Sequence, residues 1–423
     1  MSLAYFALIV SIVSASALEI AGAALGAQLG SIAAALGLLA AASSSRKADY
    51  EHYLRATSWG RWILLAIPLC IAAQLAPLPL RVAHPIWASA HEVIGGLSLG
   101  PITADIGLTV NALLLALAAI SLLGVAILVV RNRGRAELVL FVLSGVTAIS
   151  ALMLDLHRLS PALAGSVPHD LTTSLAGLGL MLNLAVMQLA AERAETHHSI
   201  VRSVAIGLCG LVGALVSAAA IFGLSGTNSA MAATFGVVLI LLILVIRRLD
   251  LSPLAASALS VAALIGAAIV LTFLFEKNSG PILLRLVPEM GTETKAALER
   301  MLADTRWFGA GAGTFPAVGR IYQSDAGAVL TAPSAATSVF AGMGWVGLVA
   351  MIAVSLLALV RLFVGALQRG RDSFFPAAAA ACVLFALVQS FAGPGLLHPA
   401  AILCLSVILG LGLSQSVSQS GSR

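Results

Sequence analysis

Charged residues are scarce in this sequence. Asp, Glu, Lys and Arg together make up 10% of the 423 residues, whereas hydrophobic residues make up 60%. A water-soluble domain carries about 25% charged residues, so the composition excludes an ordinary water-facing surface. Most of the chain must therefore lie in lipid, where helices satisfy their own backbone hydrogen bonds.

Sequence patterns that bind metal or nucleic acid are also missing. The four cysteines fall in apolar runs without C-x-x-C spacing, and the eight histidines form no H-x-x-x-H or H-E-x-x-H pattern. We therefore expect no metal and no other cofactor. The net charge is only +5 and the basic residues stand singly between apolar runs. The chain thus lacks the basic cluster that neutralises nucleic-acid phosphates, and no nucleic-acid partner is expected.

Apolar runs of about 20 residues, long enough to cross a bilayer, recur along the chain. No Lys or Arg precedes Arg46, so the first run lacks the basic region of a signal peptide and is predicted to stay as a helix. The fold class is all-α, a polytopic integral membrane protein of about twelve transmembrane helices with one large periplasmic loop. The predicted helices span 3–22, 24–42, 62–80, 106–130, 136–156, 171–190, 203–224, 230–246, 254–275, 335–359, 374–393 and 397–414.

Three parts follow from these spans, and basic residues orient them. Residues 1–275 hold the first nine predicted helices, 276–334 form the large loop, and 335–423 hold the last three helices and a cytoplasmic tail. The loops on the side of the termini hold 15 of the 23 basic residues; six others lie in the large loop, and only Arg81 and Arg158 remain. Because short loops decide orientation, both termini are predicted to be cytoplasmic.

The large loop concentrates the polar residues. Its segment PEMGTETKAALERMLADT, 288–305, predicts a short helix with an apolar face, and the glycine-rich turn GAGAGTF follows at 309–315. Intrahelical ion pairs such as Lys295 with Glu299 would account for many of the charges. The arginines on both sides of the turn also suit phosphate oxygens, because a guanidinium donates two parallel hydrogen bonds.

The GAGAGTF turn does not match a nucleotide-binding loop. It lacks the G-K-[ST] of a P-loop, and no strand is predicted before it. Its glycines allow the backbone to approach either a neighbouring helix or a phosphate held by N–H groups.

Glu19 is a carboxylate near the outer end of the first predicted span. A charge buried in lipid costs about 2.5–3.5 kcal/mol on insertion scales. Glu19 is therefore either a residue of the membrane interface, the interpretation we favour, or a functional one.

Three segments on the predicted outer side carry motifs of a known family. WFGAGAGTFPAVGRIY at 307–322 is similar to a G-x-G-x-G-x-F signature that closes a large periplasmic loop, and APSAATSVFAGMGWVGL at 332–348 is similar to the start of the next helix. Ser98, Pro101 and Thr103 form an S-x-x-P-x-T pattern in an earlier outer loop. Together with the predicted topology, these residues resemble the O-antigen ligase and polymerase superfamily of bacterial envelope enzymes.

The resemblance implies an enzyme of the bacterial inner membrane that transfers a glycan from an undecaprenyl-diphosphate carrier to a sugar hydroxyl, without nucleotide or metal. Arginines would stabilise the charge that develops on the diphosphate leaving group. The expected catalytic residues are Arg300, Arg306, Arg320 and Arg285. The expected substrate-binding residues are Gly309, Gly311, Gly313, Thr314 and Tyr322. Membrane lipids and other polysaccharide-assembly proteins are the further partners expected.

The chain differs from the family where ligases carry His-Asn and Glu. Pro333-Ser334 and Gly342 stand at those positions. A general base contributes about 10²–10⁴ in rate, so we favour a divergent polymerase that uses another carboxylate, such as Glu289 or Asp304, over a histidine-dependent ligase. A catalytically silent scaffold of a polysaccharide-assembly complex and a secondary transporter are the alternatives, although a transporter concentrates its polar site near the membrane midplane.

Overall fold

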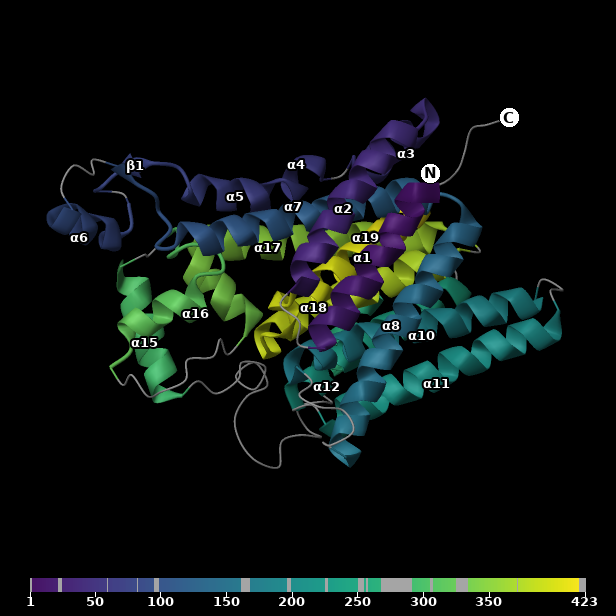
Figure 1. Ribbon diagram of the computed structural model, residues 1–423. Helices are drawn as coiled ribbons and strands as arrows, with labels where there is room; N and C mark the ends of the chain where they lie inside the picture. Colours follow the sequence, from purple (N-terminus) through teal and green to yellow (C-terminus); the bar gives the residue numbers. More distant parts are fainter. Residues whose placement is uncertain are drawn as a thin grey trace.

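The chain folds as a bundle of long helices, shown here as a computed structural model (Figure 1). The structure describes residues 2–21, 25–58, 60–81, 83–94, 99–160, 168–195, 199–224, 227–249, 255, 258–267, 291–304, 307–324, 334–370 and 372–417. The first helices are α1 (Ser2–Ile20), α2 (Leu25–Ser44), α3 (Lys47–Thr57), α4 (Arg61–Leu64), α5 (Ala66–Gln74) and α6 (Pro85–Ile94). A short antiparallel ladder pairs β1 (Leu78–Pro79) with β2 (Leu99–Gly100).

The middle and the end of the chain are also helical. The middle helices are α7 (Ile106–Val129), α8 (Arg133–Leu159), α10 (His169–Glu195), α11 (Ile200–Leu224) and α12 (Thr227–Arg248). They are followed by α15 (Thr292–Asp304), α16 (Phe315–Val318), the 3₁₀ turn η2 (Gly319–Tyr322), α17 (Ala335–Gln368), α18 (Phe374–Ala392), the 3₁₀ turn η3 (Gly395–Leu397) and α19 (Pro399–Ser416).

The all-α membrane architecture predicted from composition is confirmed. Within the described residues, nine helices are long and apolar enough to cross a membrane, and a tenth is added if the bent pair Lys47–Thr57 and Arg61–Gln74 counts as one span. The chain is therefore a multi-pass membrane protein. The count of about twelve stays a prediction, because the described parts of two predicted spans, Gln28–Ser44 and Ala258–Ala267, are shorter helices.

The predicted span 62–80 differs from the structure. The helix is interrupted between α4 and α5, and α5 ends at Gln74 after only 9 residues. Nine helical residues rise about 14 Å, which is less than half of the hydrocarbon core. Pro77 and Pro79 follow the end of α5 and remove backbone donors that a longer helix needs, so the chain turns into β1 instead.

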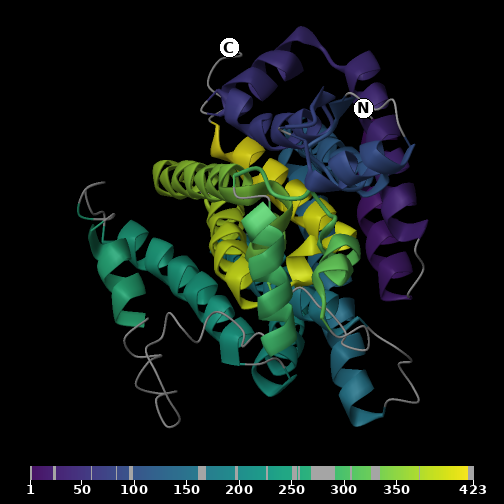
Figure 2. The same cartoon turned by 90° about the vertical axis from the view of Figure 1, so that its left-hand side faces the viewer.

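Small residues let the central helices pack closely. In Figure 2, α18 and α19 lie in the middle of the bundle, with α1 and α2 in purple on one side and α11 and α12 in teal on the other. On α18, the alanines at 377–381 are all buried. On α10, a Cβ added to Gly177 would lie 2.0 Å from Cζ of Phe385. Such contacts replace the hydrophobic effect as the cause of helix association in lipid.

The two ends of α7 mark two different ends of the molecule (Figure 1). Its 24 residues extend about 36 Å at 1.5 Å per residue. The start of α7 lies beside β1, α15, α16 and the first turns of α17, whereas its end lies beside α3. The described part of the predicted outer loop thus gathers at one end of the bundle, far from α3.

Ion pairs cluster at the end that carries α3. Glu137 of α8 accepts a hydrogen bond from Arg133 at 3.0 Å and another from Arg193 of α10. Asp372, just before α18, lies 3.1 Å from Arg133 and 3.6 Å from Arg369. The three arginines, Arg133, Arg193 and Arg369, come from loops that were predicted to share one side of the membrane. Which side that is stays a prediction.

Glu137→Ala is expected to lower thermal stability, because the side chain of Glu137 is only 11% exposed and serves two arginines. A hydrogen bond to a charged group contributes about 1.5–3 kcal/mol. The measurement is the loss of monodisperse protein in detergent on heating. Glu299→Ala is the matched control, since Glu299 is 68% exposed and lies 4.0 Å from Lys295. Equal melting temperatures for the two variants would contradict the assignment.

Candidate functional site

The described parts of the predicted outer loop meet the bundle at a glycine-rich turn. We call this region the glycine junction and define it as residues 307–315, residues 341–344 and the side chains of Gln74 and Thr103. Among the predicted catalytic arginines, Arg285 and Arg306 lie outside the described residues, as do Glu289 and the side chain of Asp304. Arg300 and Arg320 are described.

The glycines of the turn are required by their backbone conformation. Gly309, Gly311 and Gly313 have φ values of 73°, 113° and 76°, in the region that other residues rarely adopt. A Cβ on Gly309 would also lie 2.3 Å from the backbone carbon of Gly342. One on Gly311 would lie 2.0 Å from Oγ1 of Thr103. The turn is therefore built for close approach to the neighbouring segments, one of the two uses that the sequence left open.

Helix α17 is broken where it meets this turn. Gly344 has φ 64° and ψ −162°, which interrupts the helical ladder. The N–H of Ala310 donates to the carbonyl of Ala341 at 3.0 Å, and the N–H of Gly311 donates to the carbonyl of Gly342 at 2.9 Å. The glycine-rich turn thus donates hydrogen bonds to backbone carbonyls of α17 that lie beside the break. Lipid has no donors for such carbonyls.

Gln74, the last residue of α5, joins the turn to the broken helix. Its Nε2 donates to the carbonyls of Phe308 at 2.7 Å and Gly342 at 2.8 Å, and its Oε1 accepts from the N–H of Ala312 at 2.9 Å. The Gln74 residue is 4% exposed. Since the N–H groups of 310–312 all donate within the protein, they are not available to cradle a phosphate.

The predicted S-x-x-P-x-T segment also packs on the junction. The N–H of Ala104 donates to the carbonyl of Ala310 at 2.8 Å. The buried hydroxyl of Thr103 lies 2.6 Å from that of Thr109 and donates to the carbonyl of Asp105. Ser98 and residues 332–333 lie outside the described residues, but the described parts of the three segments that carry the family resemblance converge in space.

Two departures from the family pattern, Ser334 and Gly342, have structural roles here, and Pro333 lies outside the described residues. Ser334 caps α17, because its Oγ accepts from the N–H of Thr337 at 3.1 Å, and it is 2% exposed. A Cβ on Gly342 would lie 2.8 Å from the carbonyl oxygen of Gly311. A glutamate at 342 therefore does not fit this arrangement, and the serine at 334 is occupied as a cap.

Helix α15 covers the junction with its apolar face, close to the predicted range 288–305. Leu298 and Met301 are buried in a cluster with Ala310, Phe315 and Ala341. Tyr322, a predicted substrate-binding residue, is partly buried against the same cluster. Of the other residues predicted to bind substrate, Thr314 is buried and donates its hydroxyl hydrogen to the carbonyl of Gly311 at 2.7 Å.

Arg300 and Glu293 of α15 hold the segment that follows η2. The guanidinium of Arg300 donates to the carbonyl of Tyr322 and, at 2.7 Å, to Oγ of Ser324. The N–H of Ser324 donates to the carboxylate of Glu293. The Lys295–Glu299 pair expected from the helical spacing is also present, at 4.0 Å. In this conformation Arg300 positions the chain around Arg320.

Arg320 differs from Arg300 because it is exposed and its side chain makes no hydrogen bond or ion pair with the described residues. It belongs to η2, which follows α16 directly. Its neighbour Ile321 is 63% exposed. A free guanidinium on a short turn, next to an exposed apolar side chain, is suited to an anion that is attached to a lipid.

Exposed aromatic residues flank the junction. Trp307 is 66% exposed, Phe308 51% and Trp345 53%. Trp345 follows Gly344, where α17 is broken. A Cβ added to Gly344 would lie 2.1 Å from the carbonyl oxygen of Trp307. The backbones of the two tryptophans are therefore close together. Tryptophan is enriched at the boundary between bilayer and water, which favours a membrane-interface position for the junction.

Glu19 was predicted near the outer end of α1 and lies where α19 begins. Its Oε1 lies 2.8 Å from Nδ1 of His398, and its Oε2 accepts a hydrogen bond from the N–H of Ala400 at 2.7 Å. The side chain is 16% exposed. A carboxylate at a helix N-terminus satisfies orphan donors and the helix dipole, so this arrangement gives Glu19 a structural role.

No profile of a known protein family and no curated protein matches this chain. The likeness to the O-antigen ligase and polymerase superfamily thus rests on the three segments and the predicted topology. The side chain that sequence reasoning missed is Gln74, which looked like an ordinary polar end of an apolar run.

Gln74→Leu is expected to loosen the glycine junction, because the carbonyl of Phe308 and the N–H of Ala312 lose the side chain that they bind, and the carbonyl of Gly342 loses one of its two donors. Each orphaned group costs about 1–3 kcal/mol. Amide hydrogen exchange of residues 308–313, followed by mass spectrometry, should accelerate by about 10-fold or more. Gln28→Leu, at an exposed position of α2, is the control and should leave the exchange rate of residues 308–313 unchanged. Equal protection in both variants would refute the role of Gln74.

Gly311→Ala is expected to impair folding or function, because its φ of 113° and the contact with Thr103 both disfavour a Cβ. The cost should be about 1–3 kcal/mol. Gly145→Ala in α8 is the control, since a Cβ there meets nothing within 4 Å. The measurement is the yield of folded protein extracted from membranes, compared between the two variants. A Gly311 variant that is as well folded as the Gly145 variant would contradict the strain argument.

Proposed function

We propose that the protein transfers a glycan from an undecaprenyl-diphosphate carrier to a sugar hydroxyl, at the end of the bundle that carries the glycine junction. The observation that carries the proposal is Arg320, an exposed cation whose side chain has no partner among the described residues, beside a junction with exposed aromatic residues. A diphosphate on a lipid tail would present its charge to Arg320 while the tail stays in the bilayer. The convergence of the three resembling segments supports the same reaction.

The chemistry follows from the bonds that change. The acceptor hydroxyl oxygen attacks the anomeric carbon, the bond from that carbon to the diphosphate oxygen breaks, and the bonding pair leaves with the lipid diphosphate. Attack from the opposite face inverts the anomeric configuration. The guanidinium of Arg320 would stabilise the charge on the leaving diphosphate, and the proton of the acceptor passes to a carboxylate of the loop, for which Glu289 and Asp304 remain the candidates.

The local structure favours a polymerase-like relative over a histidine-dependent ligase. Ser334 is committed to its cap, and no side chain fits at Gly342. Neither position can therefore supply the proton acceptor. The free energy of transfer comes from the glycosyl diphosphate itself, so the reaction needs no nucleotide.

Arg320→Ala is expected to reduce the polymer about 100-fold, the typical loss when one charge-stabilising donor is removed. The measurement is surface glycan in a deletion strain complemented with each variant, with membrane protein levels checked by immunoblot. Arg320→Lys should retain part of the activity, because it keeps the charge and loses the planar fork. Lys295→Ala is the control, since Lys295 is 65% exposed on the neighbouring helix.

Purified protein in liposomes separates an enzyme from a scaffold or a transporter. Added lipid-linked glycan should be converted to longer lipid-linked product by the wild type and the Lys295 variant. Normal polymer with Arg320→Ala would remove this arginine from the mechanism. A wild-type protein that forms no product in liposomes would refute direct catalysis.

A further inference from the structure

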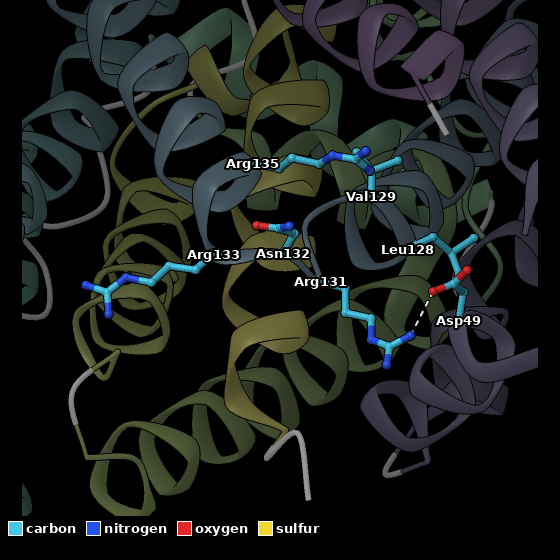
Figure 3. A pocket seen from close by; sticks show the side chains of 7 residues that line it. All are labelled: Asp49, Leu128, Val129, Arg131, Asn132, Arg133 and Arg135. Atoms are coloured by element: carbon cyan, nitrogen blue, oxygen red, sulfur yellow. Dashed lines mark hydrogen bonds and ion pairs between the residues drawn. The ribbon is translucent and has the colours of Figure 1, made fainter. Parts of the chain in front are cut away.

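An open depression lies at the other end of the bundle, between α3 and the connection from α7 to α8 (Figure 3). Its volume is about 520 Å³. The lining residues are Asp49, Leu128, Val129, Arg131, Asn132, Arg133 and Arg135. It is separated from the glycine junction by the length of α7, so the proposed transfer reaction does not use it.

The charge of the lining is mainly positive. Arg131 donates to Asp49 at 2.8 Å, and Arg133 is shared between Glu137 and Asp372. Arg135 is half-buried, and its side chain makes no hydrogen bond or ion pair with the described residues. The three arginines exceed the single carboxylate of the lining, and Arg135 is the cation that is free to bind an anion.

The arginines surround the depression and do not converge on one point. In Figure 3, the side chain of Arg131 extends to Asp49, Arg133 extends away from both other arginines, and Arg135 extends past Val129. Convergent guanidinium groups would suit one small phosphate ion. Separated cations around an open depression instead suit a larger anionic group that approaches from the surface.

The place of the depression in the fold favours a lipid headgroup. It lies where α7 ends and α8 begins, and both helices are long and apolar enough to span a membrane. Helix α1 packs against α8, which carries Arg135, and the first turns of α1 lie at the same end of the bundle as α3 (Figure 1). Leu3 and Phe6 in the same turns are 68% and 65% exposed, so apolar surface for acyl chains adjoins the free cation.

We propose that this depression binds the phosphate-bearing headgroup of an anionic phospholipid, with Arg135 as the main contact and Arg131 and Asn132 beside it. The phosphate oxygens accept hydrogen bonds from the guanidinium of Arg135, and the acyl chains lie against α1. Bound lipid would connect α1, α3 and α8 at the end of the bundle opposite to the glycine junction.

Native mass spectrometry of the purified full-length protein tests the proposal. The protein in detergent is titrated with phosphatidylglycerol or with phosphatidylcholine, and the lipid-bound fraction is measured. The wild type should retain phosphatidylglycerol in preference to phosphatidylcholine. Arg135→Gln should weaken that retention about fivefold, the effect expected for one basic residue near an anionic membrane surface.

Arg202→Gln is the matched control. Arg202 is an exposed arginine in the first turns of α11 and does not line the depression, so this variant should bind like the wild type. Equal weakening in both variants, or no preference for phosphatidylglycerol in the wild type, would overturn the proposal. Displacement of the bound lipid by millimolar inorganic phosphate would also overturn it, because the ligand would then be a free phosphate.

Discussion

A break in a membrane helix exposes backbone carbonyls to a solvent that cannot donate hydrogen bonds. The break of α17 at Gly344 creates this problem near the boundary of the bundle. A second segment satisfies these carbonyls: the N–H groups of Ala310 and Gly311 donate hydrogen bonds to the carbonyls of residues 341 and 342. Such an approach is possible only because glycines face each other there. Gln74 then supplies the remaining donor and acceptor.

This repaired break fixes the geometry of everything around it. The turn at 309–315 cannot move without uncovering buried carbonyls, so α16 and η2, which follow it directly, begin from a rigid base. Helix α15 adds an apolar cover and holds the next segment through Arg300. Arg320 thus projects from a turn that is fixed before and after it. A cation whose own position is set in advance needs little reorganisation to bind an anion.

The sequence predicted well what depends on long patterns. Apolar runs predicted the all-α membrane fold, and the spacing in 288–305 predicted the helix that became α15. It also predicted close approach at GAGAGTF, although not which of two partners the turn meets. The role of Gln74 was not predictable, because a glutamine at the end of an apolar run has many possible partners. The break at Gly344 was hidden for a similar reason. Isolated glycines are common in membrane helices, and only the partner segment reveals the one that breaks its helix.

The two ends of the bundle distribute charge in different ways. At the α3 end, arginines and carboxylates neutralise each other within the fold, as Glu137 does with Arg133 and Arg193. At the junction, backbone hydrogen bonds stabilise the fold, and the side chain of Arg320 has no partner among the described residues. Ser334 and Gly342 belong to the stabilising set, so in this chain the positions at which a ligase would hold its polar groups serve packing. A reaction at this end must therefore draw its charged groups from the loop above the junction, where Arg320 lies.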